Sequence, residues 1–263
     1  MLTTVFKPLA AGAFLALAAP ATAQEVKVPL DDPMQSGMWA YHQKELLGDP
    51  DAIAFDDRVK LSAPASAEDT VNVPLLVDAT ALENVEEIVV SADYGPIPHI
   101  LTYRPGEAQP KLSLRFKIDQ ATAIRASVRT ADGQWYVGST YIDAAGGGCT
   151  APAAAYAMSD WEEKLGEIHG QVWQSAGRAR FIVDHPMDTG LAGDIPKFII
   201  QKLSVSDDEN VELAQLELFE PVNEDPAFTL YFDPESLPPA LHISGRDNNG
   251  NEIDGTIAVS ETH

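Results

Sequence analysis

The first half of the chain contains short runs of β-branched and other apolar residues that are separated by turn signals. Some runs alternate polar and apolar positions, as Arg-Phe-Lys-Ile does at 115–118, which is typical of a strand with one buried face. Asp132-Gly133 lies between two runs and supplies the positive φ angles of a tight hairpin turn. Strands at this spacing, with prolines in or beside the turns, predict a β-sandwich. The predicted strands cover residues 71–77, 87–92, 112–118, 123–130 and 135–142.

A second β-rich block begins at Arg178 and repeats the hairpin signal at Asn249-Gly250. Its acidic run at 207–210 is predicted to be a solvated hairpin tip, because it lacks the alternating ligands of a calcium loop. Each block is long enough for one small sandwich, so we expect an all-β chain of two domains. The predicted strands of this block cover residues 178–183, 198–205, 212–218, 229–232, 241–246 and 256–259.

Two stretches have a helical pattern. Residues 37–47 form the first, which is ended by Gly48-Asp49-Pro50, and its Trp39 is expected to be a packing anchor. The second follows a Gly/Ala-rich loop that begins at Asp143. Its apolar positions recur at spacings of four, three and four, and a capping box precedes them, so we predict a helix packed on a neighbouring domain. Those apolar positions are Trp161, Leu165, Ile168 and Val172, and the capping box is Ser159 with Glu162.

The N-terminus has the pattern of a cleavable secretory signal. Lys7 precedes an apolar run at 9–19, and Ala21-Thr22-Ala23 fits a cleavage site, so residues 1–23 are predicted to be removed. The run is shorter than the roughly 20 residues that span a bilayer, and no second hydrophobic stretch follows it. The 263-residue chain has a formal net charge of -23. Nucleic acid and anionic lipid are therefore unsuitable partners, and acidity by itself favours solubility.

Cys149 is the single cysteine of the chain and follows Gly146-Gly147-Gly148. An internal disulfide is excluded, so the thiol is free or carries another group. No bulky apolar residue occurs from 144 to 155, so we expect a flexible, exposed segment rather than a buried cysteine.

Several chemical roles for Cys149 are disfavoured by its surroundings. Neither a papain-like pattern nor another local catalytic signature surrounds it, and the positions of Met158 and His169 are wrong for a blue-copper site. No Lys or Arg lies between Arg129 and Lys164, so strong activation of the thiol by sequence neighbours is not expected. The pattern suits a carried group better than an autonomous catalyst, and we predict no enzymatic activity, no cofactor and no metal site.

The six histidines show no compact metal-ligand spacing. His185 opens the conspicuous string His-Pro-Met-Asp-Thr-Gly at 185–190, which is better interpreted as a structural turn than as a metal site.

These strings resemble two protein families. Both halves are similar to the SoxY and SoxZ subunits of the periplasmic sulfur-carrier complex of thiosulfate and sulfur oxidation. The SoxY resemblance rests on 59–64, Val73-Pro74, the Asp132-Gly133 hairpin and Gly147-Gly148-Cys149; the SoxZ resemblance rests on 185–190, Ile195-Pro196 and Phe198-Ile199.

The resemblance implies two immunoglobulin-like β-sandwich domains, joined by a Gly/Ala-rich loop that bears Cys149 and by a short helix. It also implies that Cys149 holds sulfur intermediates, with Gly146, Gly147 and Gly148 as the flexible arm, while separate enzymes act on them. In SoxY the cysteine lies at a free C-terminal end, whereas here Thr150 and the second domain follow it. A loop held at both ends reaches less far than a free tail. The arrangement looks most like the fused SoxYZ-like carriers associated with quinoprotein dehydrogenases.

We therefore expect a signal peptide at 1–23, a SoxY-like domain with an N-terminal helix at 24–145, the cysteine loop and linker helix at 146–177, and a SoxZ-like domain at 178–263. The first functional hypothesis is a periplasmic carrier that presents a covalent, sulfur-containing adduct on Cys149 to redox enzymes of the Sox or quinoprotein type. The second is a non-covalent accessory protein that docks on a periplasmic quinoprotein dehydrogenase, with Cys149 incidental or redox-sensitive. An intact-mass measurement separates the two.

Overall fold

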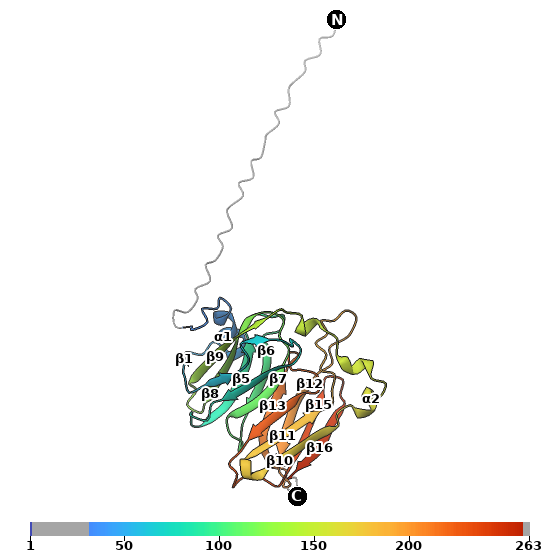
Figure 1. Cartoon of the computed structure of the whole chain (residues 1–263). Coiled ribbons are helices and arrows are strands. Elements are labelled where there is room, and N and C mark those ends of the chain that lie inside the picture. Colours follow the sequence, from blue (N-terminus) through green and yellow to red (C-terminus); the bar gives the residue numbers. More distant parts are fainter. Residues whose placement is uncertain (2–31, 260–263) are drawn as a thin grey trace.

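The computed structural model describes Met1 and residues 32–259 (Figure 1). Apart from Met1, the predicted signal segment 1–23 lies outside the described residues. Among the described residues, no helix has the length and apolar character needed to cross a membrane.

The described part of the first half contains one α-helix and nine strands, in agreement with the predicted β-rich pattern. They are α1 (Trp39–Leu47), β1 (Ile53–Phe55), β2 (Lys60–Ser62), β3 (Ser66–Ala67), β4 (Val73–Asp78), β5 (Val85–Ala92), β6 (His99–Arg104), β7 (Lys111–Phe116), β8 (Thr122–Thr130) and β9 (Trp135–Ala144).

The described part of the second half begins with short helical turns and continues with seven strands. These elements are η1 (Gly148–Thr150), η2 (Ala154–Ala157), α2 (Trp161–Lys164), β10 (Ile168–Trp173), η3 (Gln174–Ala176), β11 (Arg178–Val183), β12 (Ile200–Ser206), β13 (Glu212–Leu218), β14 (Ala227–Tyr231), β15 (Ala240–Asp247) and β16 (Glu252–Ala258).

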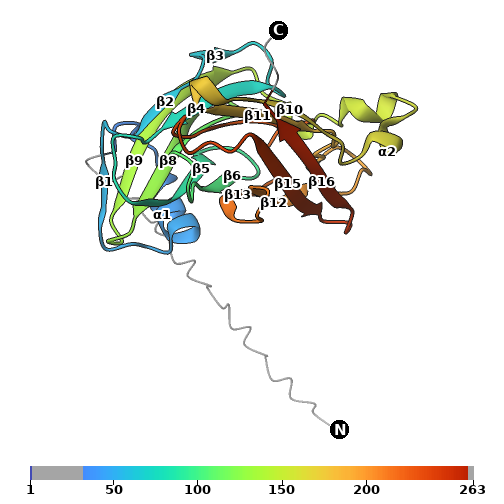
Figure 2. The same ribbon diagram turned by 90° about the horizontal axis from the view of Figure 1, so that it is seen from below.

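Two sheets run through both halves and face each other as two layers (Figure 2). The ten-stranded sheet has the order β1-β9-β8-β5-β6-β13-β12-β15-β16, with β3 paired to β9. The six-stranded sheet has the order β10-β11-β14-β7-β4-β2. The halves meet edge to edge, because β6 pairs with β13 and β7 pairs with β14, both antiparallel. Backbone hydrogen bonds therefore join the two halves in both layers.

The hydrophobic core is continuous across this junction. Leu101 of β6 is fully buried opposite Leu218 of β13, and Leu112 of β7 is buried opposite Leu230 of β14. All four belong to one cluster of packed apolar side chains that extends through both halves. Separating the halves would expose this surface to water, which costs free energy in proportion to the apolar area.

The N-terminal helix agrees with its prediction. α1 ends at Gly48, which adopts the left-handed conformation (φ 76°) that glycine accommodates without strain. Trp39 is buried, and its ring lies 4.5 Å from the guanidinium carbon of Arg125. Arg125 is itself fully buried and forms ion pairs of 2.8 Å with Asp32 and 2.7 Å with Asp93. This cluster fixes the helix to the ten-stranded sheet.

The predicted linker helix is wrong beyond Lys164. α2 stops there, Gly166 adopts a positive φ of 82°, and residues Ile168–Trp173 form strand β10, which pairs with β11 along its whole length. The apolar spacing was ambiguous, because positions 168 and 172 also lie on the same side of a strand. The predicted capping box is absent as well, since the N-cap of α2 is Asp160 and it makes no side-chain capping bond.

Candidate functional site at Cys149

The cysteine-bearing segment is packed against the body of the protein, which corrects the expectation of an exposed thiol. Cys149 is 3% exposed and lies in the single turn η1. The segment lies alongside the chain just beyond β7. The backbone N–H of Gly147 donates to the carbonyl of Asp119 (3.2 Å), and the N–H of Gly148 donates to the carbonyl of Ile118 (3.1 Å). The Cys149 thiol faces the carbonyl of Lys117 at 3.9 Å.

The glycines explain how a segment without bulky apolar residues becomes buried. A Cβ atom at Gly148 would lie 2.1 Å from the carbonyl oxygen of Thr70 and 2.5 Å from that of Ile118. A Cβ at Gly146 would lie 2.5 Å from the carbonyl oxygen of Asp119, whereas one at Gly147 would meet nothing within 4 Å. Two of the three glycines are thus needed for close backbone contact in this packed state.

The second half of the chain supplies the other side of this contact. The hydroxyl of Thr189 donates to the carbonyl of Cys149 (2.6 Å), and Asp188 accepts a bond from the N–H of Ala153 (3.2 Å). Glu224 accepts bonds from the next two N–H groups, with 2.7 Å to that of Ala154. The segment is therefore held between the two halves, and part of the 185–190 string forms its cradle.

Lys117 is a site residue that the sequence analysis missed. It is 6% exposed, and its ammonium group donates to the carbonyl of Met187 without forming an ion pair among the described residues. Lys117 lies just after β7 and continues the polar side of its alternating pattern, which gives no sign of burial. Residues 151–155 and 223–225 surround the same hollow as Lys117.

The electrostatics of the packed state favour a protonated thiol. Burial raises the pKa of Cys149 to about 11, and the charge of Asp119 raises it further, whereas the nearby Lys117 ammonium lowers it. Burial lowers the pKa of Lys117, and the negative charges of Asp188 and Glu224 oppose that shift. Burial also raises the pKa of Glu224, against its two backbone hydrogen bonds. A thiolate, the nucleophilic form, is therefore disfavoured while the segment is packed.

His185 serves the turn that cradles Cys149, as predicted. Its side chain is fully buried, and Nδ1 accepts a bond from the N–H of Met187 (2.9 Å). The ring proton of the neutral imidazole therefore lies on Nε2, which faces Asp247 at 3.6 Å. Burial lowers the pKa of His185 to about 4 although Asp247 opposes that shift, so the ring is neutral at ordinary pH.

A hollow of about 490 Å³ adjoins the packed segment. Lys117, Asn223 and Glu224 line it together with residues 151–155. The buried Oδ1 atom of Asn223 has no hydrogen-bond partner among residues 32–259. A buried ammonium and an unpaired amide oxygen thus lie at the place where the chain leaves Cys149.

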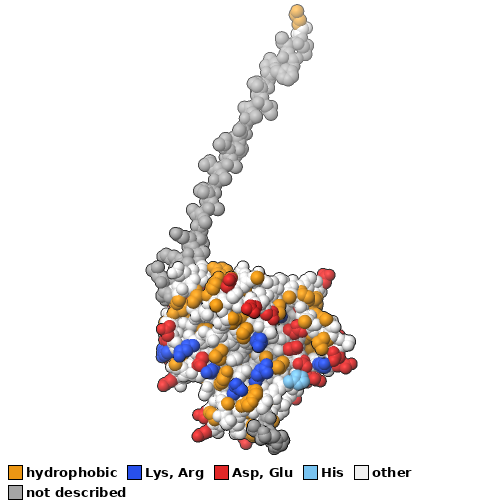
Figure 3. All heavy atoms as spheres, viewed as in Figure 1, with side chains coloured by type: hydrophobic (Ala, Val, Ile, Leu, Met, Phe, Trp, Pro, Cys, Tyr) orange, Lys and Arg blue, Asp and Glu red, His pale blue; other side chains and the backbone are white. Residues whose placement is uncertain are grey.

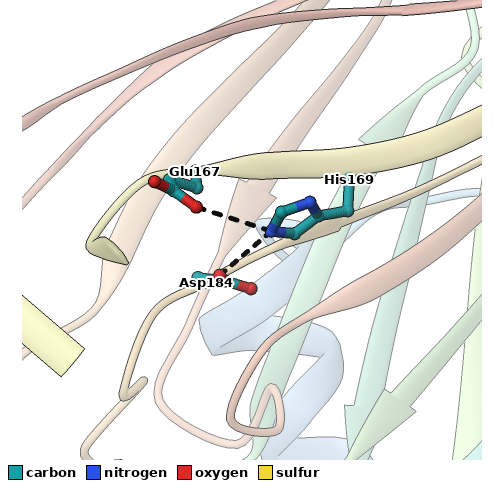
Figure 4. A group of neighbouring side chains, drawn as sticks. All are labelled: Glu167, His169 and Asp184. Carbon is teal, nitrogen blue, oxygen red and sulfur yellow. Dashed lines mark hydrogen bonds and ion pairs between the residues drawn. The ribbon is translucent and has the colours of Figure 1, made fainter. Parts of the chain in front are cut away.

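One further group of side chains has the chemistry of metal ligands. Glu167, His169 and Asp184 approach one another at the edge of β10, with His169 Nε2 3.1 Å from Asp184 and 3.8 Å from Glu167 (Figure 4). Two of the three are exposed, and the histidine is already hydrogen-bonded to Asp184. The geometry is that of a surface ion-pair group, which needs no metal to explain it.

Two family profiles match the chain in the order of its two halves. The profile "Sulfur oxidation protein SoxY" matches residues 43–149, so that it ends at the cysteine. The profile "Sulphur oxidation protein SoxZ" matches residues 171–258. A search of curated proteins found no significant match.

Solved structures resemble parts of the chain only distantly. The sulfur carrier protein SoxY from Chlorobium limicola f thiosulfatophilum is 18% identical, with a TM-score of 0.32 over 35% of this chain and 84% of that one. A superoxide reductase (neelaredoxin) from Ignicoccus hospitalis is 15% identical, with a TM-score of 0.32 over 35% and 94%. A putative superoxide reductase from Thermotoga maritima is 17% identical, with a TM-score of 0.32 over 36% and 95%.

Proposed function

We propose that this chain carries a sulfur-containing adduct on Cys149 and presents it to partner redox enzymes. The chain joins a SoxY domain to a SoxZ domain and so belongs to the SoxY/SoxZ family of sulfur-oxidation carriers. The observation that supports this role is the position of Cys149. It is the single thiol of the chain, the SoxY profile ends on it, and residues of the SoxZ half hold its segment.

The chemistry of loading requires a partner. When a thiol joins a sulfur atom of a reduced sulfur compound such as thiosulfate, an S–S bond forms, and one proton and two electrons leave. In the proposed function, an oxidising partner enzyme accepts these two electrons. In this role the chain itself needs only to bind the cargo, shield it from solvent and release it.

Presentation requires the segment to leave its packed position. Its hydrogen bonds involve the N–H groups of Gly147 and Gly148, the hydroxyls of Thr70 and Thr189, the Cys149 thiol, and the carboxylates of Asp188 and Glu224. A neutral hydrogen bond contributes about 0.5–1.5 kcal/mol net, and one to a charged group about 1.5–3 kcal/mol. Release of the segment breaks these bonds but leaves the strand pairs of both sheets intact. We infer that the structure shows the retracted form, and that a released form meets the partner.

The carrier proposal is tested by the intact mass of the protein purified from its own periplasm without reducing agents. A covalent adduct that maps to Cys149, and that is absent from Cys149→Ser made in the same cells, is the expected result. An unmodified mass under conditions of active sulfur oxidation counts against the proposal.

Export to the periplasm is part of the same proposal. The N-terminal pattern supports removal of residues 1–23, and the acidic composition suits a freely diffusing protein. N-terminal sequencing of the exported protein should begin at Gln24, and an intact Met1 would contradict export by this route.

The burial of Cys149 favours a second candidate function, a non-covalent accessory protein that docks on a periplasmic quinoprotein dehydrogenase. In that role the thiol would stay packed throughout. The two candidates differ in one measurable property, since a carrier must release the segment in the folded state and an accessory protein need not. Thiol labelling of the native protein separates them.

A further inference from the structure

The outward face of the six-stranded sheet gathers positive charge on an acidic chain. Along β7 and β11, two of the three outward positions of each strand carry basic side chains, while the intervening positions point into the core. The third outward position is Ser113 in β7 and Ile182 in β11. Five of the 17 Lys and Arg residues lie on this face. We call them the basic face: Lys60, Lys111, Arg115, Arg178 and Arg180. Figure 3 shows such side chains over the middle of the visible surface, with carboxylates mostly around them.

Most of this charge is not neutralised within the chain. Lys111 pairs with Asp78 at 2.7 Å, and Arg178 stacks on Trp173 with 4.4 Å between guanidinium carbon and ring centre. Arg115 and Arg180, by contrast, form no ion pair or side-chain hydrogen bond with any other described residue. An exposed guanidinium without a partner is available to a carboxylate from another molecule.

The same two arginines border a hollow. Its volume is about 480 Å³, and it lies at the junction of the two halves, because β7 contributes Arg115 and β11 contributes Arg180. Apolar side chains form other parts of the wall, among them Pro64, Pro74 and Leu76. A hollow with apolar walls and two free guanidinium groups fits a protruding acidic segment of a protein better than it fits water alone.

The basic face ends at the cysteine segment. Lys117 lies two residues beyond Arg115, past the end of β7, and there the chain from Ala151 to Ala155 covers the sheet. A partner that rests on the basic face therefore has the Cys149 segment at its border. This places its active site where a released segment can enter it.

We propose that the basic face is the docking surface for an acidic surface of the partner redox enzyme that acts on Cys149; the choice of partner rests on the carrier function proposed above. Complementary charge steers association and fixes the orientation of the two proteins. An anionic membrane is the alternative occupant, and the vesicle arm of the experiment below tests it.

Charge reversal tests the proposal on the full-length mature protein. Arg115→Glu with Arg180→Glu removes the free positive charge, and Lys202→Glu with Arg246→Glu is the matched control. Lys202 and Arg246 are cross-strand neighbours that are exposed on the other sheet, so both double variants change the net charge equally. If thermal unfolding shows that the variant with Arg115→Glu and Arg180→Glu is destabilised, the variant with Arg115→Gln and Arg180→Gln replaces it.

The assay measures association with proteins of the periplasmic extract of the cells that make the chain. Each variant is immobilised, retained proteins are quantified at low and high salt, and a carbodiimide maps contacts between lysines and partner carboxylates. We expect the basic-face variant to retain at least about 10-fold less of the proteins kept by the wild type and the control. Cross-links of the wild type should fall on Lys60 or Lys111.

Other outcomes would overturn the docking surface. One is an equal loss of retained proteins in both double variants. Another is that cross-links occur only at Lys202 or at other lysines outside the basic face, and a third is that the wild type retains no protein. Charge-dependent binding to vesicles of phosphatidylglycerol and phosphatidylcholine, without any retained protein, would assign the face to a membrane instead. Cys149→Ser should dock normally, because the thiol is not part of the basic face. Retention of partner proteins by a wild type whose intact mass stays unmodified during sulfur oxidation would refute the carrier function and leave the docking surface standing.

Discussion

The substitution Gly148→Ala should force the cysteine segment out of its packed position. The added Cβ would lie 2.1 Å from the carbonyl oxygen of Thr70 and 2.5 Å from that of Ile118, and both atoms belong to the backbone. Such neighbours cannot rotate away as a side chain does. Gly148 has no left-handed φ, so alanine is acceptable there once the segment is released.

The expected effect follows from the pKa of the thiol, which burial raises from an ordinary 9.0 to about 11. At pH 8, a shift of this size lowers the thiolate fraction from about one in ten to about one in a thousand. Released Cys149 should therefore react with iodoacetamide at least about 100-fold faster than the packed thiol, and steric access adds to this factor.

The assay is the rate of native labelling at pH 8, followed by intact mass, for the wild type, Gly148→Ala and a control. Thr150→Ala is a suitable control, because it changes the exposed neighbour of Cys149 without adding a Cβ. Equal labelling rates in all three proteins would refute the packing argument. Rapid labelling of the wild type would show that the segment is released most of the time.

Three further results are expected. Because the pKa of Cys149 is raised in the folded state, the contribution of the protonated thiol to stability is complete below pH 9 and is lost as pH rises through about 11. Over that pH range, the free energy of unfolding in urea should fall by up to about 3 kcal/mol more in the wild type than in Cys149→Ser. Because burial lowers the pKa of His185 from 6.5 to about 4, the contribution of the neutral imidazole to stability is present above pH 6.5 and is lost as pH falls through 4. Over that pH range, the free energy of unfolding should fall by about 3 kcal/mol more in the wild type than in His185→Asn. Finally, cleavage at a protease site inserted after Thr150 should leave the halves associated in gel filtration, because β6–β13 and β7–β14 pairs hold them; separate fragments would contradict the shared sheets.

Many strands and hairpins could be predicted because their signals come from residues that are adjacent in the sequence. The strand at 178–183 was predicted to the residue, and the hairpins at Asp132-Gly133 and Asn249-Gly250 connect β8 to β9 and β15 to β16. Strand β6 was not predicted, because prolines at 98 and 105 bracket it and have the pattern of turns. That strand joins the halves by pairing with β13, so the way in which the two domains associate was out of reach.

The site shows a different limit. Cys149 was identified from its uniqueness and its glycines, yet its exposure was mispredicted, because the atoms that bury it belong to distant backbone segments such as Thr70 and Ile118. Lys117 was missed because a strand pattern indicates which side of the sheet a residue faces, but it does not indicate which distant segments of the chain cover that side. Composition shows that a segment cannot form a core of its own, but it does not show whether another part of the protein covers it.

The central claim is that Cys149 gains and loses a covalent group during sulfur oxidation. The most direct test follows the intact mass of the protein in its own periplasm through a pulse of thiosulfate, with Cys149→Ser in parallel. The mass of the wild type should increase at Cys149 during oxidation and decline when the compound is exhausted, and the mass of Cys149→Ser should not change. A wild-type mass that stays unmodified while the cells oxidise thiosulfate would contradict it.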